Sequence, residues 1–514
     1  MDGVRDISIL PEPPSIPATI AKIDRLPPEM LVAIFVHLSK QEPDPPGRKA
    51  SYFVQDLISV THVCRSWRQV AIAAPELWTD ITMANPEAVK AFLQRSGAVP
   101  LKVGLRLGSG ARIDQDLLGA VVPHVHRFRQ LSLLTHWGRG AVGSMPFTEP
   151  APLLERLVVY YPLGDRPALL FNDQAPRLRE LNMYSNGFWL KNQLWNLTSL
   201  HVTLSHVRRI RSDFHPFFDM LCRCPALEEM SVSWGGWGVQ LESPQFPTVP
   251  LHHLRKLLLH NFRVGNIGSF LHNFDLKADG VAIHLSGVYP GPQENSVISG
   301  IQTIFPNDNS GRPSLASSTK LELIFHGRPR TMIMHTIGPG FSIRVDLSLE
   351  DFDHGGTSYT FCDVFRSVKE LWVRGSSRVD VKLHGVKHLT ALEKLVLIGR
   401  GSVTAQCLQQ ELSPGPSGVL PCPLLSVIDF HGDASNVGGL FHLLRTRSKV
   451  GGRLEKVRVP SRFVTLSADI IPYVKEVGSL DIPSSTLHMY AMELPEFCFA
   501  EEHKWWNPWK SRLN

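Results

Sequence analysis

The chain has 514 residues, too many for one compact core, so we expect two to four domains or one long repeat array. Hydrophobic residues make up 43% and charged residues 19%, a globular balance that excludes a mainly disordered chain. The formal net charge of +6 is small for this length, so composition gives no argument for nucleic acid as a partner.

The cysteine pattern and the hydropathy of the sequence indicate in which cellular compartment the protein resides. The seven cysteines are widely spaced and odd in number, unlike the dense pattern of a secreted disulfide scaffold. The N-terminal residues show no basic segment followed by an apolar core, and the longest apolar stretches are too short to cross a bilayer. We therefore expect a protein of the cytoplasm, the nucleus or both, without membrane attachment.

The first predicted helix covers residues 26–38 and follows a Pro-rich segment, residues 1–22, that we expect to be flexible. Pro27 and Pro28 suit a first helical turn, where a missing N–H costs nothing. Glu29 favours the positive end of the helix dipole. Four apolar residues at helical spacing form one stripe: Leu31, Ile34, Phe35 and Leu38.

A second helix is predicted over residues 54–73. Its inner face consists of Leu57, Val60, Cys64 and Trp67, with Val63 beside them. The segment APELWTD then turns the chain, and residues 86–96 indicate a further short helix that starts at a proline. We assign residues 23–80 to a small helical domain, and residues 81–125 to a linker with an N-terminal cap for the next domain.

From residue 126 to residue 490 one short phrase returns, with the template apolar-x-x-apolar-x-apolar. Its second half has the alternation of a short strand. Within each run the copies begin about 19 to 33 residues apart, which is typical of leucine-rich repeats. The copies are FRQLSLL, LERLVVY, LRELNMYSN, LTSLHVT, LEEMSVS and LRKLLLHN, then VKELWVR, LEKLVLI, LSVIDF and LEKVRVP.

One such unit cannot bury its own apolar face, so neighbouring units are expected to stack. The predicted fold class is α/β: a small helical domain, then a leucine-rich-repeat-like solenoid with a curved parallel sheet and irregular or helical return segments. Between about residues 265 and 365 the repeat is weaker, and VAIHLSG, KLELIFHG and FSIRVDLSL are expected to continue it. Residues 491–514 carry Trp505, Trp506 and Trp509, and form either a cap over the last repeat or a partner-binding peptide.

The helical N-terminal segment resembles an F-box. The family pattern begins with Leu-Pro-x-Glu and an apolar helix face, and it ends in Val-Cys-x-x-Trp. This sequence supplies Leu26, Pro27, Glu29, Leu31, Ile34, Phe35 and Leu38, and then Val63, Cys64, Arg65 and Trp67. The intervening loop, residues 39–53, is longer and richer in proline than the compact family version. Stretched F-boxes followed by degenerate leucine-rich repeats are similar to those of many fungal proteins.

The resemblance implies a Skp1-type adaptor as partner and, through it, a cullin that carries the RING subunit and the ubiquitin-charged E2. It places at the adaptor Leu26, Pro27, Glu29, Leu31, Ile34, Phe35, Leu38, Val63, Cys64 and Trp67. Of these we expect Pro27, Glu29 and Leu31 to face the adaptor, and Trp67 to be an internal packing anchor. The alternative is that the apolar stripe is only the core of a cap for the solenoid.

The sequence shows no recognisable catalytic or metal-binding motif. The sequence has no G-x-x-x-x-G-K-[ST] loop, no H-E-x-x-H and no G-x-S-x-G. The CRC at residues 222–224 lacks a second cysteine pair, and the histidines at 124–126 and 252–253 lack a cysteine or carboxylate cluster. We therefore expect a non-catalytic protein without cofactor or metal.

The remaining candidate site is the outward row of the predicted strands. It consists of Asn182, Tyr184, His201, Thr203, Ser231, Ser233, His260, Trp372, Arg374, Asp429 and His431. Aromatic and arginine side chains dominate interface energies. We therefore predict that a target protein binds Tyr184, His201, His260, Trp372, Arg374 and His431. The alternative is an ordinary polar strand face.

These features together predict a substrate-recognition subunit of an SCF-type ubiquitin ligase, in which the repeats choose the target. Two alternatives stay open. The chain is an F-box scaffold that acts with Skp1 outside a ligase, or it is a ligand-binding solenoid whose N-terminal helices are only a cap.

Overall fold

The computed structural model describes residues 26–39, 51–82, 85–107, 115–135, 147–160, 169–185, 189–204, 215–234, 246–277, 280–288, 305, 313–327, 330–348, 357–360, 363–375, 381–399, 405–415, 418–432, 434–481 and 492–498. The chain divides into two compact units, Met1–His136 and Trp137–Asn514. The Pro-rich segment 1–22 and the three tryptophans of the tail lie outside the described residues.

The first unit begins with short helices: α1 (Pro28–Ser39), α2 (Ser51–Val63), α3 (Arg65–Ala73) and the 3-10 turn η2 (Pro75–Trp78). The carbonyl of Pro27 accepts hydrogen bonds from the N–H groups of Met30 and Leu31, at 3.0 and 3.2 Å, so α1 starts at the double proline. The single helix expected over residues 54–73 is wrong, because Cys64 is extended and divides it. The Cys64 Sγ caps α3 by accepting a hydrogen bond from the N–H of Trp67 at 3.4 Å.

Trp78 joins these helices to a small parallel sheet of the same unit. The sheet contains β1 (Asp80–Ile81), β2 (Leu101–Leu107) and β3 (Phe128–Thr135), connected by α4 (Pro86–Arg95), α5 (Gln115–Val121) and η3 (Val122–Arg127). The Trp78 Nε1 donates to the carbonyl of Ala71 at 2.8 Å, and its ring meets Phe92 edge-on with centroids 4.9 Å apart. The Arg95 guanidinium lies 4.3 Å from the Trp78 ring centroid. One buried indole thus fixes α3, η2 and α4 together.

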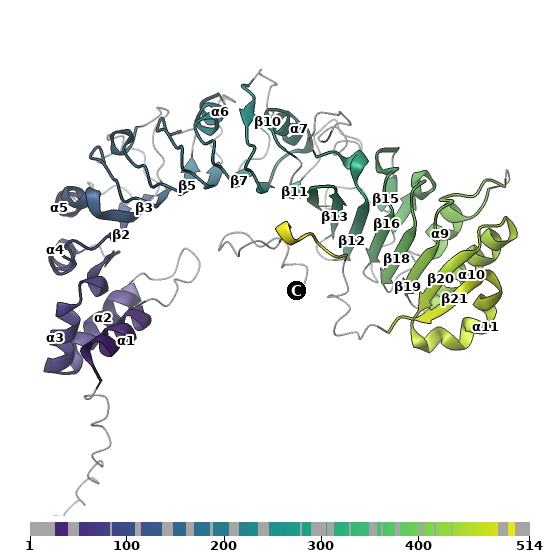
Figure 1. The fold of residues 1–514 in the computed structure, drawn as a ribbon, viewed down its shortest axis with the longest axis horizontal. Coiled ribbons are helices and arrows are strands. Elements are labelled where there is room, and N and C mark those ends of the chain that lie inside the picture. The colour runs from purple at the N-terminus through teal and green to yellow at the C-terminus, as the bar shows by residue number, and fades with distance from the viewer. Residues whose placement is uncertain are drawn as a thin grey trace, which may run out of the picture. The chain divides into compact units, whose positions relative to one another are not determined.

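The second unit contains a long sheet in which most neighbouring strands are parallel (Figure 1). In spatial order its strands are β4 (Arg156–Tyr160), β5 (Glu180–Ser185), β6 (Ser199–Leu204), β7 (Glu229–Trp234), β9 (Lys256–His260), β11 (Val281–Val288), β14 (Phe341–Ser348), β13 (Arg330–Gly338), β12 (Lys320–Gly327), β16 (Glu370–Gly375), β18 (Lys394–Gly399), β19 (Val427–His431), β20 (Leu454–Val459) and β21 (Val474–Ser479). Each copy of the repeated phrase is a strand, and the copy FRQLSLL is β3 of the first unit.

One strand in the middle of this sheet, β13, runs opposite to its two neighbours. VAIHLSG, KLELIFHG and FSIRVDLSL form β11, β12 and β14, but β13 lies antiparallel between β12 and β14. An uninterrupted parallel repeat over residues 265–365 is therefore wrong. The cause is local, because only residues 328–329 separate β12 from β13, and Gly340, with φ of 72°, closes the turn from β13 to β14. Connections this short join antiparallel strands, whereas parallel neighbours need a longer crossover.

Helices of the second unit lie on one face of the sheet (Figure 1). They are α6 (His215–Cys222), α7 (Val264–His272), α9 (Ala405–Leu412), α10 (Ala434–Lys449) and α11 (Ser467–Ile470). The remaining short elements are β8 (Val249–Pro250), β10 (Phe274–Asp275), β15 (Thr357–Thr360), β17 (Val381–His384), η4 (Phe171–Asp173), η5 (Leu315–Ser317), η6 (Asp363–Phe365), η7 (Val386–His388), η8 (Ser461–Leu466), η9 (Ile471–Tyr473) and η10 (Glu496–Cys498). Within the described ranges, no helix is long and apolar enough to cross a membrane.

Arg447 on α10 holds the segment that follows α9. Its guanidinium is buried and donates to the backbone carbonyls of Leu412, Pro421 and Cys422, at 3.3, 2.7 and 3.0 Å. Cys422 has a φ of 44°, a left-handed conformation that costs a non-glycine residue about 1–2 kcal/mol. Arg447 binds the carbonyls on both sides of this position, so it stabilises a backbone that is strained on its own.

We expect Arg447→Met to destabilise the second unit by about 2–4 kcal/mol, because three buried carbonyls lose a charged donor. Arg445, exposed on the same helix, supplies the matched control Arg445→Met, which should change stability by less than about 0.5 kcal/mol. Urea unfolding followed by circular dichroism measures both variants. Equal stability of the two variants would contradict this role for Arg447.

Candidate partner-binding surfaces

Helix α1 carries two apolar stripes, and one of them faces solvent. Met30, Ile34 and Leu38 recur every four residues and are 52%, 37% and 43% exposed. Nearby on α2 and α3, Ile58, Val63 and Ile72 are also exposed. Six large hydrophobic side chains at the surface of so small a helical segment are typical of a protein-binding face.

The second stripe of α1 forms the core of the helical segment. Leu31 and Phe35 are buried, and the Phe35 ring lies 5.1 Å from the half-buried Trp67 ring. Leu31 was expected to face a partner, but it is already covered by its own unit and offers almost no further area to bury. We therefore correct the expected roles of Leu31 and Phe35: they support the surface from below.

The other N-terminal residues singled out in the sequence divide in the same way. Pro27, Glu29 and Val63 are exposed, and Leu26 is half-buried. Cys64 is exposed, but its Sγ is engaged as the cap of α3. The sequence missed Met30, although its spacing of four residues from Ile34 was a usable signal.

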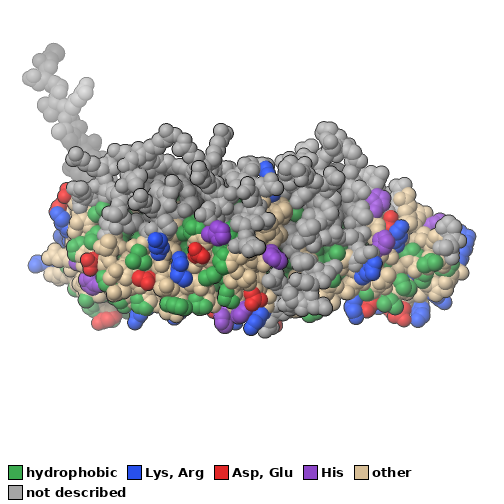
Figure 2. Space-filling model, turned by 90° about the horizontal axis from the view of Figure 1, so that it is seen from above, with side chains coloured by type: hydrophobic (Ala, Val, Ile, Leu, Met, Phe, Trp, Pro, Cys, Tyr) green, Lys and Arg blue, Asp and Glu red, His purple; other side chains and the backbone are tan. Residues whose placement is uncertain are grey.

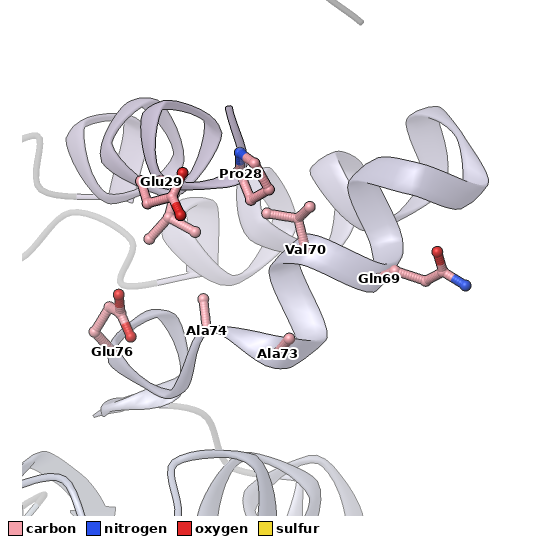
Figure 3. A pocket seen from close by; sticks show the side chains of 8 residues that line it. Pro28, Glu29, Gln69, Val70, Ala73, Ala74 and Glu76 are labelled. Carbon is pink, nitrogen blue, oxygen red and sulfur yellow. The ribbon is translucent and has the colours of Figure 1, made fainter. Parts of the chain in front are cut away.

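A cavity of about 500 Å³ opens between α1, α3 and η2, on the side of α1 away from Met30, Ile34 and Leu38. It is lined by Pro28, Glu29, Val32, Gln69, Val70, Ala73, Ala74 and Glu76 (Figure 3). Glu29 and Glu76 both lie at the left of this view, and Val70, Ala73 and Ala74 lie to their right (Figure 3). This arrangement suits an apolar side chain with a cationic neighbour from a partner.

Residues 23–84 match the family model described as F-box-like. This stretch is an F-box-like domain. The match supports an F-box protein, and F-box proteins are generally non-catalytic adaptor subunits that bind Skp1. A search of curated proteins finds no relative that matches the chain.

The F-box-like domain is only one candidate surface, because the long sheet has a face opposite its helices. Parallel pairing aligns Tyr160, Tyr184, Thr203, Ser233 and His260 across five adjacent strands. The rings of Tyr160 and Tyr184 stack with centroids 5.8 Å apart and an interplanar angle of 18°. Burial raises the pKa of Tyr160, and burial lowers the pKa of His260. We call these five residues the tyrosine row.

A ladder of ion pairs runs along the same face, and on β4, β5, β7 and β9 its members lie four residues before the tyrosine row. Arg156 pairs with Glu180 at 2.6 Å, and Glu229 pairs with Lys256 at 2.6 Å. Further along the sheet, Glu370 pairs with Lys394 and with Lys320, and Lys456 pairs with Glu476. The signal for these pairs lies in the charged x positions of LERL, LREL, LEEM and LRKL, where adjacent strands carry opposite charges.

The expected target-binding residues fall into two groups. Tyr184, His201, His260 and His431 are half-buried on the open face. Trp372 is only 5% exposed, and Arg374 is paired with the buried Glu322 at 3.2 Å. Both residues lie on the predicted face, but Trp372 is covered and Arg374 is paired within the sheet, so neither is open to a target in this structure.

The cover over Trp372 comes from the chain's own C-terminal region. Met492 packs with Ile337, Trp372, Val396 and Ile398, and Leu494 packs against the same cluster. Cys498 packs with Ala282, next to Leu494 and Phe497. We call residues 492–498 the strap. It lies over middle strands of the sheet and apart from β21, so this part of the tail is not a cover for the last strand (Figure 1).

A buried polar cluster sits on the same face at β11 and β14. The Arg344 guanidinium binds Asp346 at 2.7 and 3.2 Å, and His284 Nε2 lies 3.0 Å from the Asp346 carboxylate. Burial lowers the pKa of His284. Burial opposes ionisation of Asp346, but its hydrogen bonds and charge interactions with His284 and Arg344 outweigh this and bring its pKa to about 2.

Other features bear on chemistry. Among the described residues, no group of three or more His, Cys, Asp or Glu is placed to hold a metal ion. Burial raises the pKa of the Cys224 and Cys422 thiols to about 12, which disfavours the reactive thiolate at both positions. Acidic and basic side chains are interspersed over the visible face (Figure 2). Binding of an apolar partner is the chemistry that these surfaces support best.

Substitution by alanine should affect stability differently in the two stripes of α1. Phe35→Ala should destabilise the helical segment by about 3–5 kcal/mol, because it removes a buried ring. Ile34→Ala should cost less than about 0.5 kcal/mol, because that side chain is exposed. Hydrogen exchange of the amides in α1 to α3, read by mass spectrometry, distinguishes them. Faster exchange in Ile34→Ala than in Phe35→Ala would contradict the assignment of the stripes.

The depressed pKa of Asp346 predicts a pH dependence. Its folded-state pKa of about 2 lies below the reference value of 3.8, so ionised Asp346 contributes stability above about pH 4 that is lost as pH falls toward 2. The stability gap between wild type and Asp346→Asn should therefore narrow between pH 4 and pH 2. Urea unfolding at several pH values measures the gap, and a constant gap would rule out this linkage.

Proposed function

We propose that this chain is a substrate-recognition subunit of an SCF-type ubiquitin ligase. The F-box-like helices bind a Skp1-type adaptor and, through it, a cullin. The second unit is a leucine-rich-repeat-like solenoid that binds the target protein. The subunit is not itself a catalyst: it holds a target near the ubiquitin-charged E2. It acts in the cytoplasm, the nucleus or both.

The observation that carries this proposal is the exposed stripe of α1 within a segment that matches the F-box-like family model. A stable protein gains nothing by exposing Met30, Ile34 and Leu38 in one line, unless a partner helix covers them. We place the adaptor on this stripe and on Pro27, Glu29 and Val63. The tyrosine row, with His201 and His431, is the proposed target-binding face.

The adaptor interface is tested with the full chain and purified recombinant Skp1. Ile34→Asp combined with Leu38→Asp should weaken binding at least about 100-fold, because an unpaired carboxylate in an apolar interface costs several kcal/mol. Both residues are exposed in the free chain, so the melting temperature should stay near that of wild type. Affinity is measured by calorimetry.

Ile471→Asp is the matched control, because Ile471 is an exposed isoleucine of the second unit, and it should leave Skp1 affinity unchanged. Failure of the wild-type chain to bind Skp1 would contradict the ligase proposal and would favour the alternative that the helices only cap the second unit. Co-purification of a cullin with the wild-type complex separates a ligase subunit from a scaffold that acts with Skp1 alone.

A further inference from the structure

The strap occupies a preformed apolar strip on the sheet. The strip consists of Ala282, Ile337, Trp372, Val396 and Ile398, contributed by β11, β13, β16 and β18. These strands are far apart in the chain and are brought together by strand pairing alone. The strip therefore exists as a surface of the sheet, whether or not the strap is seated on it.

Trp372 is held in place by neighbours on its own face of the sheet. Its Nε1 donates to the Glu370 carboxylate at 3.0 Å, and the Lys394 ammonium lies 5.1 Å from its ring centroid. Lys394 also pairs with Glu370, so the indole is fixed by two neighbours of its own sheet. A large aromatic held this way is ready for a ligand at low entropic cost.

The strap shows what kind of segment fits. Met492 and Cys498 are buried and Leu494 and Phe497 half-buried against the strip, whereas Glu493 and Glu496 are exposed. The segment MELPEFC thus places apolar side chains on the sheet and carboxylates outward. Its second half is the 3-10 turn η10, in which the Cys498 N–H donates to the Pro495 carbonyl at 3.0 Å, so the strap adds no strand to the sheet.

We propose that residues 492–498 are an intramolecular ligand of the target-binding face, and that a target segment with apolar side chains toward the sheet and acidic side chains outward takes their place. This inference rests on the proposed role of the sheet in target binding. The strip is an apolar part of that face, and the strap keeps it from water until a target arrives.

The test uses the full chain and a fluorescein-labelled peptide of residues 492–498, with reductant present. In Met492→Asp combined with Leu494→Asp the strap should leave the strip, and the peptide should bind at least about tenfold more tightly than to wild type. The reason is that a tethered strap competes at an effective concentration of about millimolar. Glu493→Gln combined with Glu496→Gln changes exposed positions of the same strap and should behave as wild type.

Adding Trp372→Ala to the strap variant should abolish the gain, because it removes the centre of the strip. No peptide binding by a strap variant that melts like wild type would overturn the proposal. If the strap variant fails to fold, hydrogen exchange of the wild-type chain decides. Strap amides that exchange at least about 100-fold faster than those of β16 and β18 support a detachable strap, and exchange only with global unfolding overturns it.

This experiment is independent of the adaptor. Peptide binding is measured without Skp1, so the strip can be tested even if the chain does not bind Skp1. Conversely, failure of the peptide to bind the strip would not affect the Skp1 interface.

Discussion

Each strand of the long sheet has two faces, and the helices cover only one of them. On β4 to β7 the covered row holds Leu157, Leu181, Leu200 and Met230, all buried. The opposite row holds the side chains that remain for partners. Backbone pairing locks the register, and a slip of one residue would exchange the two rows. The same hydrogen bonds that build the core therefore also fix which side chains line the open face.

The side chains of helix α1 are also divided between a buried and an exposed face, but at helical spacing. Leu31 and Phe35 point inward, and Ile34, one residue from Phe35, points outward. A segment of three short helices has too little interior to bury both stripes. The motif residues consequently serve two purposes: one set gives the helices a core, and the other set needs a partner.

The sequence predicted those features that depend on neighbours along the chain. The strands were predictable because their alternation is local, and α1 was predictable from its prolines. The buried and exposed stripes of α1 could not be told apart from the sequence, because Leu31, Ile34 and Phe35 fall on one broad helix face. Only the packing of α2 and α3 decides which of them are buried. Strand β13 was missed because RTMIMHTIG lacks the leucine template. The burial of Trp372 had no local signal, because Met492 covers it from 120 positions away.

The open face joins two kinds of surface, and their energetics differ. In the ladder, charges such as Arg156 and Glu180 already satisfy one another, so a ligand gains little from them and pays to separate them. The apolar strip offers area to bury, but it is short. A tethered segment tolerates weak contacts because its local concentration is high, whereas a free ligand must supply more contacts to reach the same occupancy. The tyrosine row lies on the same face of the sheet and offers these additional contacts. On the proposed function, a target that engages both the tyrosine row and the strip would displace the strap, whereas a target that matches only one of them would have no such advantage.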